Sequence, residues 1–384
     1  MPTAKNLTYL RARNQGAVLE TLLRAENISK QDLAHRLNLT PMSISYIAGD
    51  LLEKGILQEN RAERIKKETP GRRGIALKVT PSRLLAIGVS VSRRNLCVSL
   101  VDLCGNTLQS KSHRHGEKVT AESLTEMISD DTSEILSTVE HENVLGIGVS
   151  ASGLVDMQEK TIIFTTDFYG ISNWKIGKIL EEKFSLPCFV AEDMKAAGLA
   201  EYYYGAAKNL SDFIYLGITY GLGAGVIAGG KLLEGNRGFC GEVGHTTLYH
   251  DGLLCGCGNR GCAEMYLSVE AIKRRCGIPD FEAFVSLCEK EPQNAAVCEI
   301  AHDLATLLVN IVNNFDAEAI VIGHEGAALP NTFFARVNDE VNRRILAKSV
   351  KTVSILPSEI PKEIHALNGA AIIFFQLFAG YFKL

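Results

Sequence analysis

One histidine and three cysteines lie close together in the second half of this 384-residue chain. His245, Cys255, Cys257 and Cys262 form the pattern His-x9-Cys-x-Cys-x4-Cys. One imidazole and three thiolates satisfy the tetrahedral coordination of Zn²⁺, with sulfur ligands at about 2.3 Å. Glycines around the cysteines let the chain turn tightly enough for the sulfurs to converge. Four protein ligands leave no open position for water, so the pattern predicts structural zinc rather than a catalytic metal.

The alternative for these cysteines is a set of buried free thiols. Sulfur packing alone does not require three cysteines so close together with a glycine between them. The other seven cysteines have no such spacing, and we interpret them as reduced core thiols of a protein without an export signal. They are Cys97, Cys104, Cys188, Cys240, Cys276, Cys288 and Cys298.

Carboxylates form a second group of candidates. Glu192 and Asp193 follow an apolar segment, Glu242 precedes His245 by three positions, and Glu264 follows the last cysteine of the zinc pattern. Sugar hydroxyls both donate and accept hydrogen bonds, and one carboxylate accepts from two of them. We therefore expect the acids, taken together, to form a sugar site. The alternative for any single one of them is an ordinary surface charge.

A glycine-rich segment runs from Gly217 to Gly225. Successive backbone N–H groups in such a turn can bind phosphate. The same composition also suits a tight hairpin, and the sequence does not separate the two.

Residues 81–384 alternate strand and helix patterns, which predicts an α/β domain. Repetition of the order suggests two lobes with a ligand cleft between them. The predicted strands and hairpins are 84–91, 96–102, 144–150, 188–192, 212–218, 224–228 and 319–323. The predicted helices are 121–139, 174–184 and 295–315.

The N-terminal segment 1–80 differs from the rest of the chain in charge. It carries 14 basic and eight acidic residues, a net charge of +6, whereas the remaining chain is −10. Apolar spacing predicts helices over 9–24 and 29–38, and the pair Thr40-Pro41 is a strong start signal for a third helix over 41–54. Short strands at 56–58 and 75–79 follow. Two helices joined by a short turn and then a basic hairpin predict a winged helix-turn-helix.

The third helix is the expected DNA-recognition helix, since it begins with small and polar residues. Its contact residues would be Pro41, Met42, Ser43, Ser45 and Tyr46. The wing would bring Arg72 and Arg73 to backbone phosphates or a narrow minor groove. The alternative for this module is a small protein-interaction domain.

Composition excludes several classes. Hydrophobic residues make up 46% of the chain and charged residues 22%, as in globular proteins with large cores. We found no signal peptide and no run of about 20 uncharged apolar residues, so we expect a cytoplasmic protein without membrane attachment.

Two segments carry a resemblance to a known family, namely 241–245 (GEVGH) and 255–264 (CGCGNRGCAE). Here the chain resembles the ROK family of sugar kinases and sugar-responsive repressors, over almost its whole length. The resemblance implies a two-lobed actin-like ATPase fold behind the winged helix. It implies that Asp193, Glu242, His245 and Glu264 contact sugar hydroxyls, with Gly153 and Asn173 assisting and Glu192 in place of the usual Asn.

The chain departs from the kinases of that family at the phosphate hairpin. Kinases carry Asp-x-Gly-Gly-Thr there, whereas residues 90–94 read Ser-Val-Ser-Arg-Arg. Loss of the carboxylate removes an anchor for Mg²⁺, and arginines replace residues that let phosphate approach the backbone. The adenosine-side motif reads Gly323-His324-Glu325 in place of a glycine pair. We therefore expect no nucleotide cofactor and no kinase activity.

The predicted organisation is a winged helix over 1–80, a first lobe over 81–195 joined by a C-terminal helix over 366–384, and a second lobe over 196–365. The leading hypothesis is a repressor that leaves a double-stranded DNA operator when a sugar or sugar phosphate enters the cleft. A sugar kinase is the runner-up, and a regulator controlled by a sugar-transport protein is the third. A homodimer or homotetramer would match a palindromic operator.

Overall fold

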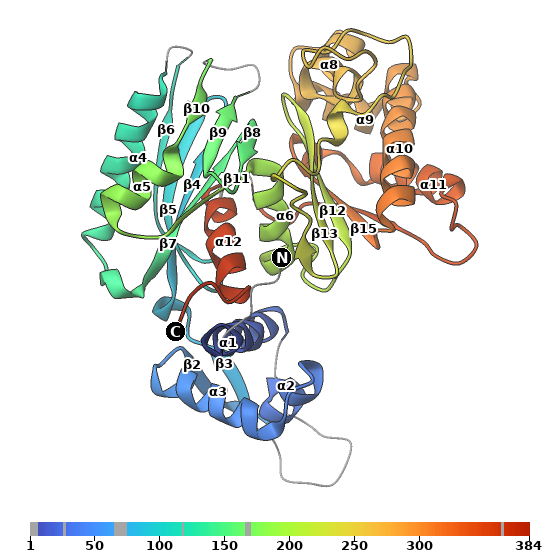
Figure 1. Cartoon of the computed structure of the whole chain (residues 1–384). Coiled ribbons are helices and arrows are strands. Elements are labelled where there is room, and N and C mark those ends of the chain that lie inside the picture. The colour runs from blue at the N-terminus through green and yellow to red at the C-terminus, as the bar shows by residue number, and fades with distance from the viewer. Residues whose placement is uncertain (1–6, 26–27, 65–74, 117–118, 166–169, 362–364) are drawn as a thin grey trace. The chain divides into compact units, whose positions relative to one another are not determined.

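The computed structural model describes residues 7–25, 28–64, 75–116, 119–165, 170–361 and 365–384. The chain forms two compact units, residues 1–191 with 364–384 and residues 192–363 (Figure 1). The predicted separation of segment 1–80 as a domain of its own stays a prediction.

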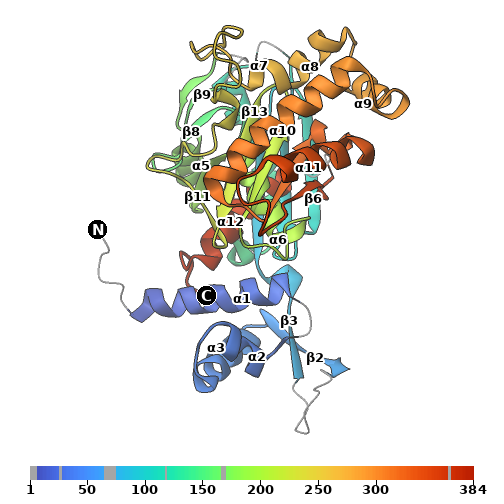
Figure 2. The ribbon, with the colours of Figure 1, turned by 90° about the vertical axis from the view of Figure 1, so that its right-hand side faces the viewer.

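The N-terminal part of the first unit contains three helices and a small sheet, α1 (Leu7–Arg24), β1 (Ile28–Ser29), α2 (Lys30–Arg36), α3 (Pro41–Glu53), β2 (Leu57–Arg64) and β3 (Ile75–Val79). The three strands have the order β1-β3-β2. Ser29 and Asp32 form a capping box that starts α2, and the Thr40 hydroxyl accepts from the Ser43 N–H at the start of α3. Figure 2 shows this helix-turn-helix and hairpin under the long α1. The tip of the predicted wing, with Arg72 and Arg73, lies outside the described residues.

The rest of the first unit is built on a five-stranded sheet of order β11-β7-β4-β5-β6. Its strands are β4 (Leu85–Val91), β5 (Asn95–Asp102), β6 (Thr107–Arg114), β7 (Val144–Ala151) and β11 (Cys188–Glu192). Apolar side chains of α4 (Ala121–Leu136) and α5 (Ile176–Phe184) pack on one face. A small sheet of β8 (Leu154–Asp156), β9 (Thr161–Phe164) and β10 (Ser172–Trp174) precedes α5. Short 3-10 turns occupy Pro81–Arg83 and His141–Asn143.

Helix α12 (His365–Phe378) packs closely on the other face of this sheet. A Cβ atom added to Gly88 would lie 1.9 Å from the Ala366 carbonyl oxygen, and one added to Gly148 would lie 1.9 Å from that of Gly369. The missing side chains therefore let the helix backbone approach the strands.

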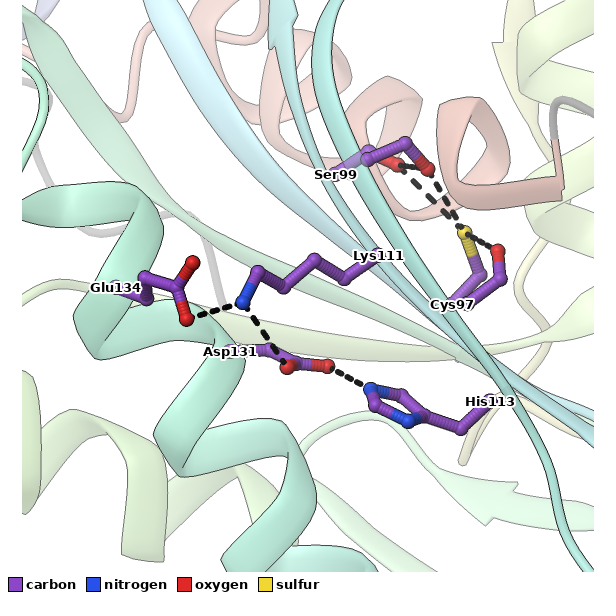
Figure 3. A network of polar contacts seen from close by, with 8 residues as sticks. Cys97, Ser99, Lys111, His113, Asp131 and Glu134 are labelled. Carbon is purple, nitrogen blue, oxygen red and sulfur yellow. Dashed lines mark hydrogen bonds and ion pairs between the residues drawn. The ribbon is translucent and has the colours of Figure 1, made fainter.

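A polar network joins the edge strand β6 to α4 (Figure 3). The buried Asp131 carboxylate on α4 lies 2.7 Å from His113 Nε2 and 3.9 Å from the Lys111 ammonium. Lys111 also forms an ion pair with Glu134. On the neighbouring strand, Cys97 lies among serine hydroxyls, with Ser110 Oγ at 3.4 Å. All of these groups find partners within the network, so we assign it a structural role.

The second unit contains a sheet of order β14-β13-β12-β15-β16. Its strands are β12 (Phe213–Ile218), β13 (Leu222–Ala228), β14 (Lys231–Leu232), β15 (Ala319–His324) and β16 (Ser354–Pro357). Helix α6 (Asp193–Tyr204) packs on β12 and β13, while α10 (Ala295–Phe315) and α11 (Asn331–Arg344) lie side by side on the opposite face (Figures 1 and 2). Helices α7 (Glu264–Leu267), α8 (Val269–Cys276) and α9 (Phe281–Lys290) and 3-10 turns Val243–His245 and Glu325–Ala328 complete the unit.

The two large sheets have the same strand order relative to chain order. In each, the first strand pairs antiparallel with the second and parallel with the fourth, and the third strand lies next to the second. A repeated five-stranded unit is the architecture expected of a two-lobed actin-like fold, and the predicted fold class is confirmed.

Helix α10 is long and apolar enough to cross a membrane by length and composition alone. We did not expect a segment of this kind from the sequence. Eleven of its residues are buried, and all of them except Asp303 belong to the apolar core of the second unit, including Leu304 and Leu308. The burial explains the apolar composition as that of a core helix.

Candidate functional site

The predicted metal ligands come together in the second unit. The ligand atoms of His245, Cys255, Cys257 and Cys262 all lie within 4.8 Å of one another. Cys257 Sγ and Cys262 Sγ are 3.7 Å apart, and Cys255 Sγ is 3.7 Å from His245 Nδ1. A tetrahedral ion with sulfur ligands at about 2.3 Å places its ligand atoms about 3.8 Å apart. The donor set and its spacing therefore fit a metal ion such as zinc.

Tight turns produce this convergence. Gly258 and Gly261 have φ values of +93° and +70°, which favour glycine, and Gly261 passes so close to Tyr249 that a Cβ atom would lie 1.6 Å from its carbonyl oxygen. Backbone hydrogen bonds from Cys255 N to Asn259 O (2.8 Å) and from Gly258 N to Cys255 O (3.0 Å) close the turn.

A buried acid on α10 holds the loop that carries the cysteines. Asp303 accepts a hydrogen bond from the Tyr249 hydroxyl and pairs with Arg275 of α8 at 2.7 Å. Burial, together with Asp303, raises the pKa of Tyr249 to about 12, so the phenol remains a donor. Sequence reasoning missed Asp303, because a lone acid in an apolar helix has no spacing signal.

The predicted sugar ligands Glu192 and Asp193 lie where β11 ends and α6 begins. Glu192 is buried and forms an ion pair with Lys195, whose side chain is also buried. Burial raises the pKa of Glu192, and the nearby charges of Glu242 and Asp193 add to the rise, whereas the paired Lys195 ammonium opposes it and favours the ionised form. Asp193 is half-buried at the start of α6.

Glu242 and Glu264 lie near the same strand, β13. Glu264 Oε2 accepts a hydrogen bond from Leu222 N at 3.1 Å. The segment that carries Glu242 crosses β13 closely, since a Cβ atom on Gly244 would lie 2.0 Å from the Leu222 carbonyl oxygen. Glu192 Oε1 lies 3.4 Å from the Cβ position of Gly223 on that strand. The structure thus brings Glu192, Glu242 and Glu264 to the beginning of β13.

The glycine-rich segment 217–225 forms the β12–β13 hairpin. A Cβ atom on Gly225 would lie 2.4 Å from the Met194 carbonyl oxygen, so glycine permits the close approach of α6. This packing supplies a structural reason for at least one glycine of the segment.

Two predicted sugar-site residues belong to the first unit. Gly153, between β7 and β8, has a φ of +117°, and a Cβ atom there would lie 2.4 Å from the Phe164 carbonyl oxygen. Asn173 is exposed in β10 with a φ of +51°. The segment 90–94 forms the end of β4 and the turn into β5, with Arg94 exposed.

The outward face of α3 carries the predicted DNA contacts. Met42 and Tyr46 are 84% and 64% exposed, and Pro41 and Ser45 are exposed beside them. Ser43 is half-buried, and its hydroxyl lies 2.9 Å from that of Thr40 at the cap. The Arg11 guanidinium lies 5.4 Å from the Tyr46 ring centre, a cation–π contact that orients the ring.

Lys195 and Asp50 are structural features of these sites that sequence reasoning missed. Lys195 stands three positions after Glu192, directly before the small and apolar segment 196–200, which is a signal for a buried pair. Asp50 of α3 accepts from Gln15 Nε2 at 2.7 Å and pairs with Arg11 at 3.0 Å, so it ties α3 to α1.

Comparison with known proteins agrees with this geometry. Residues 86–376 match the ROK family model, and residues 11–58 match a winged helix-turn-helix DNA-binding model. The xylose repressor of Bacillus spizizenii is 28% identical, with 95% of this chain and 96% of the relative covered. The DNA-binding transcriptional dual regulator NagC of Escherichia coli is 25% identical, with 92% and 91% covered.

Solved structures share the fold. A ROK family transcriptional regulator, a homologue of the E. coli MLC protein, superposes with a TM-score of 0.76 at 23% identity and covers 97% of this chain and 98% of its own. A ROK hexokinase from Thermus thermophilus gives a TM-score of 0.65 at 25% identity and covers 75% of this chain and 97% of its own. The resemblance predicted from the sequence is confirmed.

Proposed function

The chain belongs to the ROK family, and from this premise we propose that it is a sugar-responsive, DNA-binding repressor. The observation that carries the proposal is the combination of a winged helix, with an exposed recognition face, and the carboxylates gathered at β13. Its relatives over nearly the whole length are named as xylose and N-acetylglucosamine repressors.

The DNA-binding half of the proposal depends on shape and charge. Helix α3 would lie in the major groove and present Met42, Ser45 and Tyr46 to base edges. The basic wing would bind phosphates, in keeping with the net charge of +6 over segment 1–80. A dimer would match a palindromic operator and place two recognition helices about one helical turn apart.

The sugar-sensing half depends on the acids of the second unit. Glu192, Asp193, Glu242 and Glu264 would accept hydrogen bonds from sugar hydroxyls, and Gly153 and Asn173 complete the proposed set. His245 would serve as a metal ligand with Cys255, Cys257 and Cys262. Zinc would supply a structural cross-link there, which holds the segment from Glu242 to Glu264 in one conformation.

We propose that the protein is not a sugar kinase, although kinases share its fold. The turn after β4 has Ser92 and Arg93 where kinases have two glycines, and Ser90 where they have the Asp, which supports this view. We place the protein in the cytoplasm, where DNA and a metabolised sugar meet.

The testing experiment is a titration of the purified protein on its own upstream DNA. Binding is followed by fluorescence anisotropy with D-xylose, D-glucose, N-acetyl-D-glucosamine and their phosphates, each with and without ATP and Mg²⁺. We expect one sugar to release the DNA without ATP consumption. ATP-dependent sugar phosphorylation without specific DNA binding would overturn the proposed repressor function and show that the protein is a kinase.

A further inference from the structure

Lys195, the buried partner of Glu192, has no role in the function proposed so far. The Lys195 side chain is 1% exposed and that of Glu192 is 10% exposed. A lysine buried to this extent requires an anionic partner, because desolvation of an unpaired ammonium is very costly. Glu192 is that partner, three positions earlier along the chain.

Packing fixes the position of both side chains. Helix α6 lies against β13 so closely that a Cβ atom on Gly225 would lie 3.1 Å from the Lys195 Cα. Two positions earlier in the strand, on the same face, Gly223 leaves room for the Glu192 carboxylate. The pair is therefore held between the first turn of α6 and the hairpin.

The surroundings place this pair within the proposed sugar site. Glu192 Oε1 lies 3.4 Å from the Cβ position of Gly223, and the N–H of the preceding residue, Leu222, donates to Glu264 Oε2 at 3.1 Å, so the pair lies beside the strand residues that hold Glu264. The charges of Glu242 and Asp193 add to the rise in the pKa of Glu192. Lys195 opposes that rise, as a neighbouring positive charge does. The ammonium is too buried to contact a sugar directly, so any effect of Lys195 on a sugar must pass through Glu192.

We propose that Lys195 is a positioning residue that holds Glu192 as a hydrogen-bond acceptor for one hydroxyl of the effector, and that the pair thereby determines sugar preference. This inference rests on the proposed function. An ionised carboxylate only accepts hydrogen bonds, whereas a protonated one also donates. Without Lys195, burial favours the protonated form, and the site would present a donor where the preferred sugar also presents one.

The protonation state of Glu192 gives a specific expectation for variants of the pair. Glu192→Gln and Lys195→Met both introduce a donor at the same place, so each should weaken the response to the preferred sugar by about tenfold or more relative to the other sugars. Because the two residues act as one unit, the double variant should lose no more than the single variants. Lys195→Arg keeps the positive charge and should retain the wild-type ranking.

The experiment measures release of operator DNA by D-xylose, D-glucose, D-galactose and N-acetyl-D-glucosamine, each as the free sugar and as its phosphate, for wild type and these variants. Lys160→Met is the matched control, because Lys160 forms an ion pair with Glu181 in the first unit, and its ranking should equal that of wild type. If a single variant does not fold, Glu192→Asn with Lys195→Asn removes both charges together and should still change the ranking.

Two outcomes separate this inference from the proposed function. Folded variants that rank the four sugars as wild type does, within about twofold, overturn the role of the pair alone. Wild-type protein that none of the sugars releases from DNA contradicts the proposed function and this inference with it. A changed ranking in Lys195→Met, restored in Lys195→Arg, supports both.

Discussion

The Lys54 ammonium, at the end of the recognition helix α3, donates a hydrogen bond to the Leu384 carbonyl oxygen at 2.8 Å. Leu384 follows α12, the helix packed on the large sheet of the first unit. Lys54 also pairs with Asp50 at 3.1 Å. The segment after α12 is thus attached to the helix that we expect to read DNA, within one compact unit.

A second attachment joins α12 to α1, and it gives our first prediction. A Cβ atom on Gly16 would lie 2.6 Å from the Leu377 carbonyl oxygen and 2.7 Å from that of Phe378. Gly16→Ala should therefore force the two helices apart and lower the free energy of unfolding by about 1–3 kcal/mol. Urea denaturation followed by circular dichroism measures the change. An unaltered midpoint would show that α1 does not pack on α12 in solution.

The same substitution in α3 should have the opposite effect. No atom of the described chain lies within 4 Å of a Cβ atom placed on Gly49, which is exposed in the middle of the helix. Alanine costs less backbone entropy than glycine, so Gly49→Ala should raise the free energy of unfolding by about 0.5–1 kcal/mol. Denaturation under the conditions used for Gly16→Ala checks the sign, and destabilisation would indicate that the outward face is covered.

Much of this fold could be predicted where local signals are strong. Thr40, Pro41 and Gly55 define α3, whose observed range, Pro41–Glu53, differs from the predicted one by a single residue. Continuous apolar runs identify β12 and β15, because strands that are buried on both faces consist almost entirely of apolar residues.

Other elements lack such signals. The edge strand β6 contains one large apolar residue, Leu108, and that residue is exposed, so its sequence shows no strand period. Helix α6 was missed because ten of its twelve residues are buried, which removes the polar face that reveals an amphipathic helix. Tertiary contacts, rather than local pattern, determine both elements.

The candidate sites divide in the same way. Metal-ligand spacing predicts His245 and its cysteines, because the four ligands are close in sequence. The partners Tyr249 and Asp303 are 54 positions apart, and their contact becomes visible only when α10 is in place.

Asp50 gives a prediction about pH. Burial alone would raise the pKa of its carboxyl, but hydrogen bonds from Lys54 and Arg11 outweigh burial and lower the pKa below the ordinary 3.8. The stabilisation from these contacts is therefore complete above the ordinary pKa and is lost as the pH falls through the lower, folded-state pKa. Asp50→Asn should cost about 1 kcal/mol, with the partial exposure of these groups taken into account.

Urea denaturation of wild type and Asp50→Asn at pH 7.5, 5 and 3 tests this sign. The difference in unfolding free energy should be equal at the two higher values and smaller at pH 3. A difference that grows on acidification would contradict the lowered pKa of Asp50.

Metal content is the next prediction. Cys257→Ser removes one of four ligands, so purified protein should fall from about one zinc ion per chain to well below that value. Loss of the cross-link should also lower the thermal midpoint. Atomic absorption measures the metal, and Cys104→Ser, outside the cluster, serves as the control that keeps its zinc. A Cys257→Ser protein with full metal content and wild-type stability would contradict the structural role of the site.

The last prediction separates the wing from the recognition helix. Arg72→Ala with Arg73→Ala removes two expected phosphate contacts, so affinity should fall equally on operator and random DNA, and the slope of log affinity against log salt should lose about two units. Tyr46→Ala removes a contact expected at a base edge and should cost about 1–3 kcal/mol on the operator with little change on random DNA. Fluorescence anisotropy at several salt concentrations measures both. Equal losses on the two DNAs for Tyr46→Ala would mean that α3 does not read the sequence.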